Sequence, residues 1–526
     1  MTNLVHEFIF DAAHARPKAQ ALVYRDSQLN YQSLATQVDA MASALLACGI
    51  GSAERVGVYL EKRIETVVSL FGAAAAGAVF VPINPLLKQT QVAHILCDCN
   101  VRILVTSAQR LSALADIIAL CCDLRTVIIV GPLPPLPLPP LPRIDIVMWD
   151  AAIEAGGHAP AHRRIDSDMA AILYTSGSTG RPKGVVLSHR NLVAGAASVA
   201  QYLQNTSNDR ILAVLPLSFD YGLSQLTTAF HAGACVVLMN YLFPRDIVTI
   251  VARERISGLA AVPPLWIQLA QQAWPAESSL RYITNSGGAL QRPTLDKIRR
   301  ALPRTDVYLM YGLTEAFRST YLPPSELDRR PDSIGRAIPN AEVMVVRPDG
   351  TLCAPDEPGE LVHRGALVAQ GYWNDPQKTA ECFRPAPNRS EMFSVPELAV
   401  WSGDTVRADK EGFIYFIGRD DDMIKVSGYR VSPHEVEEVV YATGLVAEAV
   451  AIGVPHPQFG QAVVVIAPRS DDFSPQSLIQ ACQSRLPSYM MPAHVGQWEG
   501  SLPRTANGKI DRKLLQRSMA AFFATR

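Results

Sequence analysis

The stretch YTSGSTGRPKGVV, residues 174–186, carries the strongest structural signal in the sequence. It follows an apolar run, AAILY, that predicts a strand. The glycines at 177, 180 and 184 permit turns that bring backbone amides close to an anion. Hydroxyl donors and one cation complete this loop: Thr175, Ser176, Ser178, Thr179 and Lys183. Such a loop suits a polyphosphate. It does not match the Walker pattern, which excludes a P-loop NTPase.

Outward from this loop, helical and strand patterns alternate. Val38, Met41, Leu45 and Cys48 mark an amphipathic helix that ends at Gly49. Strands are predicted at RVGVYL, VRILVTS, TVIIVG and ACVVLMN. The apolar run from 67 to 83 is interrupted by Ser69 and Pro82, and it is interpreted as a buried helix leading into a strand. This alternation favours a parallel sheet with helices on both faces.

Composition limits the functional classes. The 526 residues are 48% apolar and 18% charged, with a net charge of −1, which gives no electrostatic reason to expect nucleic acid or an anionic membrane. The first residues lack the basic start and apolar run of a signal peptide. Nine scattered cysteines suggest free thiols in a reducing cytoplasm, and their spacing predicts no structural zinc. The proline-rich segment 131–143 predicts a stiff surface loop, or alternatively a ligand for a proline-binding module.

The character of the chain changes near Arg419. A charged turn, GRDDD, precedes a compact segment with strands at AVAIGV and QAVVVIAP and helices at HEVEEVVYA and SLIQACQSRL. We therefore expect two domains, 1–420 and 421–526.

TSGSTGRPKG resembles the signature of the superfamily of acyl- and aryl-CoA synthetases, adenylation domains of nonribosomal peptide synthetases, and luciferases. Further signatures follow in order from LNYQSL (29–34) to NGKIDR (507–512), so the resemblance covers nearly the whole chain. It implies an α/β fold: a large N-terminal domain of mixed sheets flanked by helices, and a hinge to a small α+β C-terminal domain. It also implies an AMP-forming ligase that uses ATP and Mg²⁺, with the phosphopantetheine thiol of CoA or of a carrier protein as acceptor.

The same resemblance assigns the nucleotide site. NSGGAL looks like the adenine-edge loop, with Gly287, Gly288 and Ala289. In YGLTEA, Tyr311 is expected to stack on adenine, Thr314 to contact the α-phosphate and Glu315 to hold magnesium, a hard cation that prefers carboxylate oxygen. Asp404 of WSGDT corresponds to the ribose ligand, and Arg419 to a ribose or phosphate contact.

Three further residues are placed by resemblance in the C-terminal part. Asp421 falls at the hinge, Gly428 falls where a pantetheine arm passes, and Lys509 falls at the catalytic lysine. The stretches GELVHRG and QGYWNDP, within 359–376, match a part of the family whose role is largely architectural.

The acid pocket departs from the fatty-acyl and aryl type, which usually carries a histidine near PLSFDYGLSQL (216–226). The aspartate here, Asp220, looks like that of amino-acid-activating members, where it pairs with the substrate ammonium. A buried carboxylate needs a cation, which favours an amino acid or another acid with a positive nitrogen. The alternative is that Asp220 caps a helix, in which case a fatty or aryl acid remains open. By resemblance, four residues fall near the specificity pocket: Tyr221, Ser224, Met310 and Phe317.

FDYGLSQL and YGLTEAFRSTYLPP are similar to two subgroups: exosortase-associated acyl-CoA ligases and free-standing prolyl carrier-protein ligases. No phosphopantetheine attachment site follows the C-terminal segment, so the thiol is expected from CoA or a separate carrier protein. Two other classes compete with a ligase: a luciferase-like oxygenase and a catalytically silent binding protein.

Overall fold

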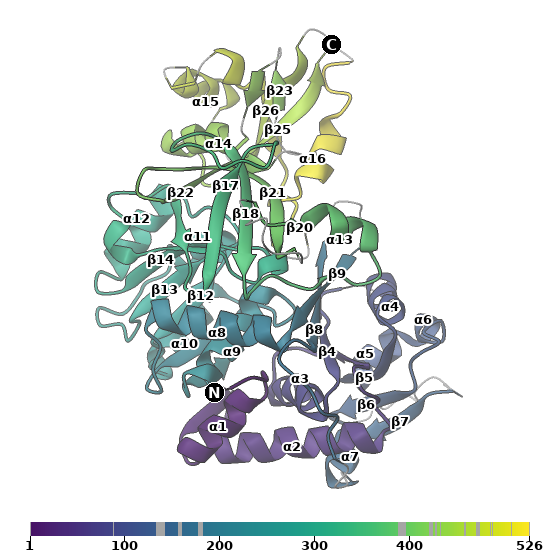
Figure 1. Ribbon diagram of the computed structural model, residues 1–526. Coiled ribbons are helices and arrows are strands. Elements are labelled where there is room, and N and C mark those ends of the chain that lie inside the picture. The colour runs from purple at the N-terminus through teal and green to yellow at the C-terminus, as the bar shows by residue number, and fades with distance from the viewer. Residues whose placement is uncertain are drawn as a thin grey trace.

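The computed structural model describes residues 2–524, except for 88, 133–142, 156–159, 177–181, 388–395, 420–423, 427–428, 432, 457–458, 470–473, 484, 487 and 506–507. Within these residues, the strands form three sheets (Figure 1). Two large sheets build the body of the molecule, and a small one lies in the C-terminal segment at one end.

The largest sheet has 14 described strands and changes character along its width. Its strands, in spatial order, are β17 (Ala341–Val346), β18 (Gly359–Gly365), β21 (Leu398–Ala408), β22 (Ile414–Arg419), β16 (Ser333–Ala337), β15 (Thr320–Leu322), β14 (Asp306–Tyr311), β13 (Tyr282–Asn285), β12 (Gly258–Ala261), β10 (Arg210–Ala213), β11 (Cys235–Leu238), β1 (Gln20–Tyr24) and β2 (Ser27–Asn30), with β20 (Phe383–Pro385) beside β21. From β14 through β10 and β11 to β1 the strands are parallel, whereas from β15 to β17 they are antiparallel. The predicted parallel pairing is therefore found in one part of this mixed sheet, and it is found again in most of the second sheet.

The second sheet has eight described strands and contains the hairpin that flanks the glycine-rich loop. Its order is β19 (Gly371–Tyr372), β9 (Pro182–Ser188), β8 (Met169–Ser176), β4 (Val79–Pro82), β3 (Arg55–Tyr59), β5 (Val101–Ser107), β6 (Thr126–Val130) and β7 (Asp145–Met148). Strands β3, β5 and β6, and β11 of the larger sheet, confirm the four strand predictions.

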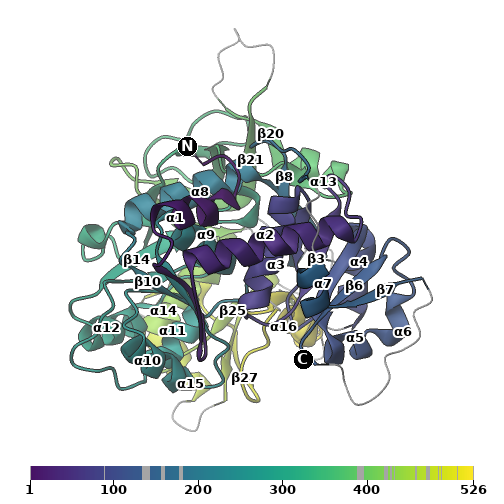
Figure 2. The ribbon, with the colours of Figure 1, turned by 90° about the horizontal axis from the view of Figure 1, so that it is seen from below.

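Helices fill the space between the two large sheets and cover their outer faces (Figure 2). The helices of the body are α1 (Glu7–Ala15), α2 (Tyr31–Ala47), α3 (Ile64–Ala76), α4 (Gln89–Asp98), α5 (Ala108–Ala113), α6 (Ala115–Ile118), α7 (Trp149–Ala155), α8 (His189–Leu203), α9 (Asp220–His231), α10 (Pro244–Arg253), α11 (Pro263–Leu269), α12 (Arg292–Ala301) and α13 (Pro376–Cys382), with short 3₁₀ turns η1 (Thr314–Ala316) and η2 (Pro324–Glu326). Helix α3 touches both sheets, and α8 and α9 pack together with α8 on the smaller sheet and α9 on the larger.

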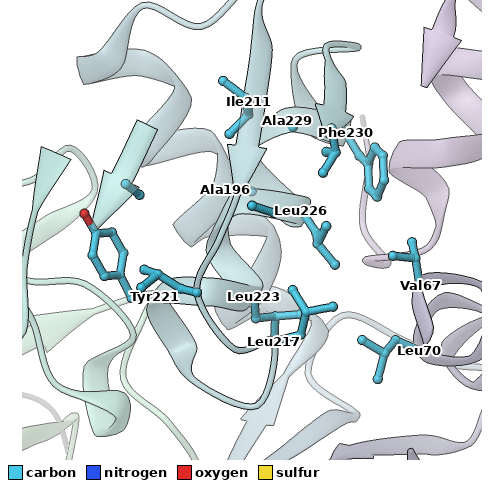
Figure 3. Close-up of a cluster of buried hydrophobic side chains, with 14 of the residues drawn as sticks. Val67, Leu70, Ala196, Ile211, Leu217, Tyr221, Leu223, Leu226, Ala229 and Phe230 are labelled. Carbon is cyan, nitrogen blue, oxygen red and sulfur yellow. The ribbon is translucent and has the colours of Figure 1, made fainter. Parts of the chain in front are cut away.

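Helix α9 is central to this packing. Figure 3 shows Leu226 and Phe230 of α9 turned toward Val67 and Leu70 of α3, while Tyr221, in the first turn of α9, points the other way. One apolar cluster thereby joins both sheets, and burial of such surface stabilises the body at roughly 25 cal/mol per Å². Helix α3 and strand β4 also confirm that the run from 67 to 83 is a buried helix followed by a strand.

The C-terminal segment has its own sheet and two apolar layers. Its strands are β24 (Tyr429–Val431), β23 (Ile424–Val426), β26 (Gly460–Pro468), β25 (Val450–His456) and β27 (His494–Trp498), and its helices are α14 (Pro433–Ala442), α15 (Pro475–Cys482) and α16 (Arg512–Met519), with the 3₁₀ turn η3 (Ser488–Met490). Separate clusters of buried side chains lie on the two faces of this sheet. The large sheet ends at Arg419 and the small one begins at Ile424, so the predicted boundary at Asp421 itself lies outside the described residues.

Other features suggested by the sequence can be checked against the described residues. No helix in the described part of the chain is long and apolar enough to span a bilayer. The described residues also include no group of three His, Cys, Asp or Glu side chains arranged to hold a metal ion. All nine cysteines are free thiols. Most of the proline-rich segment lies outside the described residues.

Candidate active site

The adenine-edge loop predicted from NSGGAL follows β13 directly. Strands β13 and β14 are parallel neighbours, and both end at the same edge of the large sheet, where α/β proteins bind ligands. Asn285 closes the turn because its Nδ2 donates to the Gly288 carbonyl over 2.9 Å. Its Oδ1 is buried without a hydrogen-bond partner among the described residues. A base amino group could donate to this oxygen.

Tyr311, the last residue of β14, meets the predicted ribose ligand. Its hydroxyl donates to Asp404 Oδ2, and Asp404 is only 5% exposed. Asp404 pairs with Arg419 across β21 and β22, so three residues predicted from separate motifs come together. The Tyr311 ring lies 6.3 Å from that of Phe416, which lies 6.0 Å from His434 of α14. A chain of rings therefore connects this edge to the C-terminal segment.

Thr314 and Glu315 begin the short turn η1, which follows β14 after two intervening residues. The Tyr372 hydroxyl donates to Glu315 Oε1 over 2.6 Å, and the Ala369 amide donates to the Glu315 carbonyl over 2.8 Å. Burial and the neighbouring carboxylate raise the pKa of Tyr372, so its hydroxyl keeps its proton at ordinary pH. Tyr372 therefore fixes one oxygen of Glu315.

The glycine-rich loop connects β8 to β9, whose antiparallel register sets Thr175 directly opposite Lys183. Lys183 Nζ lies 3.2 Å from Asp375 and 5.9 Å from the centre of the Tyr372 ring. A hydrogen bond from the Lys378 amide, aided by Lys183, lowers the pKa of Asp375. The tip of the loop, with Gly177, Ser178, Thr179 and Gly180, lies outside the described residues, as do the side chains of Ser176 and Arg419.

Asp220 lies in a different setting, inside the core. It is the first residue of α9, whose N-cap residue is Phe219 and which has no side-chain cap. The Asp220 carboxylate accepts from Arg318 Nη1 over 2.7 Å. Asp220 is 4% exposed and Arg318 1% exposed. The cation that burial of Asp220 requires is therefore supplied within the chain. Pairing with a substrate ammonium stays a prediction, but burial of Asp220 does not require it.

An unusual backbone turn directs Arg318 inward. Phe317 has φ 53° and ψ −42°, a region that non-glycine residues rarely adopt, and the Arg318 amide donates to the Ala316 carbonyl over 2.5 Å. Phe317 fits here because Gly195 of α8 faces it; a Cβ at Gly195 would lie 2.6 Å from the ring. Gly222 similarly allows α9 to lie against the Pro216 backbone, where a Cβ would overlap the carbonyl oxygen.

A small cavity adjoins this ion pair. Its lining includes Tyr221, Ser224, Thr228, Met310 and Arg318. Three of the four predicted pocket residues therefore surround one space, and the fourth, Phe317, precedes Arg318 in the chain. The Tyr221 hydroxyl and Thr284 Oγ1 are 2.5 Å apart, and the Arg318 guanidinium lies 4.8 Å from the Tyr221 ring centre.

The predicted lysine lies in the C-terminal segment. Lys509 is exposed in a hairpin that is closed by a bridge between Arg504 and Ile510 and by a 2.8 Å hydrogen bond from the Thr505 amide to the Lys509 carbonyl. Asp421 and Gly428 lie outside the described residues.

Comparison with known families matches this chain twice. Residues 9–373 match the model of the AMP-binding enzymes, and residues 435–509 match that of the AMP-binding enzyme C-terminal domain. The chain belongs to the AMP-binding enzyme family. The match to the adenylate-forming superfamily predicted from the motifs is thereby confirmed.

Relatives of this AMP-binding enzyme include both longer proteins and proteins of its own length. It is 28% identical over 522 residues to tyrocidine synthase 1 of Brevibacillus parabrevis, a match that covers 97% of this chain but only 44% of that protein. ATP-bound MatB from Rhodopseudomonas palustris has a TM-score of 0.86 at 24% identity, covering 99% of this chain and 100% of that one. O-succinylbenzoate coenzyme A synthetase (MenE) from Bacillus subtilis, solved with ATP and a magnesium ion, has a TM-score of 0.81 at 25% identity, covering 97% and 98%. These likenesses confirm the predicted fold class.

The described residues of this AMP-binding enzyme fit a magnesium nucleotide chemically. The unpartnered Asn285 Oδ1 could accept from a base, the Asp404 carboxylate suits vicinal hydroxyls, and the Lys183 ammonium suits a phosphate. Glu315 offers carboxylate oxygen, and Mg²⁺ bound with phosphates commonly needs only one or two carboxylates from the protein.

Sequence reasoning missed three residues that contact predicted site residues: Tyr372 beside Glu315, Asp375 beside Lys183, and Arg318 beside Asp220. Tyr372 and Asp375 lie in QGYWNDP, a stretch for which the resemblance implies a largely architectural role. Arg318 follows the YGLTEA motif by two residues, and the signal that could have found it was the requirement for a cation near Asp220.

Proposed function

We propose that this protein uses ATP and Mg²⁺ to convert a carboxylic acid to an acyl-adenylate and then transfers the acyl group to a phosphopantetheine thiol. A carboxylate oxygen attacks the α-phosphorus, the bond to the β-phosphate breaks, and pyrophosphate leaves. The thiolate sulfur then attacks the acyl carbonyl carbon and releases AMP. The observation that carries the proposal is the convergence of Tyr311 with Asp404 and of Glu315 with Tyr372, on the sheet edge beside the Thr175–Lys183 hairpin.

In this proposal, each residue at the sheet edge contacts a different part of the nucleotide. Tyr311 stacks on adenine and, through its hydroxyl, orients Asp404 toward the ribose. Thr314 contacts the α-phosphate. Glu315, with one oxygen held by Tyr372, binds magnesium through the other. Lys183 leaves Asp375 for the phosphates when the nucleotide binds, since a triphosphate offers more negative charge than one carboxylate.

Lys509 reaches the reacting groups in the adenylation step through movement of the C-terminal domain, residues 421–526, about a hinge at Asp421. Its ammonium bridges the substrate carboxylate and a phosphate or ribose oxygen, which reduces repulsion between two anions. A second domain position removes the lysine and admits the thiol along Gly428. Such a movement would break the contact between the rings of Phe416 and His434.

The identities of the acid substrate and of the thiol that accepts the acyl group are the finer parts of the proposal. The side chains around Asp220 hold the acid, and the thiol belongs to CoA or to a separate carrier protein. The resemblance to adenylation domains of nonribosomal peptide synthetases favours an amino acid, whereas Asp220 already has a cation in Arg318.

The test is ATP–pyrophosphate exchange with amino acids, alkyl acids, aryl acids and oxo acids, with and without magnesium. Acid-dependent exchange that requires magnesium is expected. Lys509→Ala should abolish it, while Lys513→Ala, which removes an exposed lysine on α16, should leave it unchanged. The proposal would be contradicted if no acid in the panel supported exchange, or if the two variants exchanged at equal rates. Acid-dependent oxygen uptake with light emission would instead identify a luciferase-like oxygenase.

A further inference from the structure

Arg318 carries a buried polar atom that the nucleotide site does not use. Its Nη1 donates to Asp220 Oδ2 over 2.7 Å and to the Phe317 carbonyl over 2.9 Å. Its Nη2 is buried and has no hydrogen-bond partner among the described residues. A buried donor without a partner carries a desolvation cost of its own, so the environment of Nη2 calls for an acceptor.

The cavity beside Arg318 is where an acceptor would lie. The space open to the centre of a water-sized sphere is about 10 Å³, which is room for about one water molecule or one substrate oxygen. Ser224 and Thr228 contribute hydroxyls 3.4 Å apart, and Met310 contributes an apolar wall. A space of this size accepts a single polar group and excludes a long alkyl chain.

The charge of the pair restricts that group further. Asp220 and Arg318 neutralise each other at near-complete burial. A second carboxylate would leave a net negative charge in the core, and an ammonium would leave a net positive charge next to a guanidinium. An uncharged acceptor satisfies Nη2 without adding any charge to a region that stabilises charge poorly.

The strained turn at Phe317 indicates that the position of Arg318 is specified by the chain. A residue at φ 53° persists only where its surroundings hold it, and the close fit of Gly195 against the Phe317 ring provides that support. The strain lies two residues after Glu315, so one short segment carries both the proposed magnesium ligand and Arg318.

We propose that Arg318 recognises the acid substrate. The substrate is a compact carboxylic acid that carries an uncharged acceptor oxygen, such as an oxo or carboxamide group, and this oxygen accepts a hydrogen bond from Arg318 Nη2. Asp220 acts as a positioning residue that fixes Arg318, and it does not bind a substrate ammonium. This inference rests on the proposed adenylation, and it adds the class of acid.

The test compares matched pairs of acids of three to six carbons in pyrophosphate exchange. Each pair has the same shape with and without the acceptor, for example 4-oxopentanoate and 4-methylpentanoate, and is accompanied by the dicarboxylate and the amino acid of similar length. We expect one acceptor acid to exceed its alkyl partner by about 100-fold or more in kcat/KM, because a site built around a donor rejects an analogue that lacks the acceptor.

Two variants connect that preference to Arg318. Arg318→Lys keeps a cation for Asp220 but lacks the second donor nitrogen of the guanidinium. The paired variant, Asp220→Leu with Arg318→Met, replaces the ion pair by apolar groups and should preserve folding. In both, the preference should fall to near unity. Arg281→Lys is the matched control, because Arg281 pairs with the buried Asp209 at another edge of the sheet; it should keep the preference.

The outcomes separate the two claims. If no acid supported pyrophosphate exchange, the proposed function and this inference would both be contradicted. Exchange that favours the alkyl acid, the dicarboxylate or the amino acid, or an acceptor preference that survives both Arg318 variants, would overturn the inference and leave the adenylation intact.

Discussion

The two halves of the candidate site are built in different ways. On the nucleotide side, Tyr311, Glu315 and Lys183 lie at strand ends and loops. Glu315 and Lys183 contact polar partners that are partly exposed, whereas Tyr311 contacts the buried Asp404. On the acid side, Asp220 and Arg318 form an ion pair inside the core, between residues 98 positions apart. The first half depends on short motifs near water, and the second on tertiary packing.

This contrast has an energetic consequence. Partly exposed ion pairs such as Lys183 with Asp375 contribute about 0–1 kcal/mol to folding, so the chain can break them when a ligand arrives. A buried pair is costly to separate, because each charge would remain in a medium of low polarity. The nucleotide half is therefore suited to exchanging partners, and the acid half to keeping a fixed shape.

The largest expected effect tests the dependence of the nucleotide half on the C-terminal domain. Lys509→Ala should lower adenylation by about 10³-fold, because it removes a cation that opposes anion repulsion in the transition state. Thioester formation from supplied acyl-adenylate should stay near the wild-type rate, since that step does not need the lysine. Pyrophosphate exchange and thiol consumption measure the two steps. If both are equally impaired, Lys509 acts structurally.

The second prediction compares one aspartate from each half. Asp220→Asn leaves Arg318 buried without a counter-charge, and folding should lose about 3–5 kcal/mol. Asp404→Asn keeps an oxygen that accepts from Tyr311, so the loss should be about 1 kcal/mol or less, while KM for ATP rises. Urea unfolding and exchange kinetics give the two readings. Equal losses of stability would remove the distinction between the halves.

The sequence predicts these halves unequally, and the reason is physical. The sequence predicts Tyr311, Glu315, Asp404 and the Thr175–Lys183 turn as site residues, because their chemistry is concentrated in contiguous motifs. Strands also followed from local patterns, because alternation and apolar runs are local properties. The 98-residue contact of Asp220 was not predictable, since it depends on the turn at Phe317 and on the packing of α8 and α9. The sequence predicted that Asp220 needs a cation, but it did not predict which one.

The third prediction concerns the support of the metal ligand. Tyr372→Phe removes the hydroxyl that donates to Glu315, a bond to a charged acceptor worth about 1.5–3 kcal/mol. The magnesium concentration for half-maximal exchange should rise about tenfold, with little change in KM for the acid. Tyr415→Phe is the control, because Tyr415, in β22 of the larger sheet, also donates to a carboxylate, that of Asp409, over 3.2 Å. A magnesium dependence unchanged by Tyr372→Phe would argue against Glu315 as a ligand.

The smallest expected effect tests the support behind Arg318. His363 of β18 is fully buried, and its Nδ1 lies 2.9 Å from the hydroxyl of Ser319, the residue after Arg318. Burial lowers the pKa of His363 to about 4, whereas the unfolded chain should titrate near the ordinary value of about 6.5.

The sign of the pH effect follows from proton binding. Between these two pKa values the unfolded chain binds more protons than the folded one, so the contribution of neutral His363 is complete above about pH 6.5 and is lost as the pH falls toward 4. Folding stability should drop by about 1 kcal/mol more between pH 6.5 and 5.5 in the wild type than in His363→Asn. Other buried histidines, such as His189, titrate in both proteins, and the comparison of the two urea midpoints across pH removes their effect. Parallel pH profiles would mean that protonation of His363 does not strain the segment that holds Arg318, and the rigidity ascribed to the acid half would then have to come from the turn at Phe317 alone.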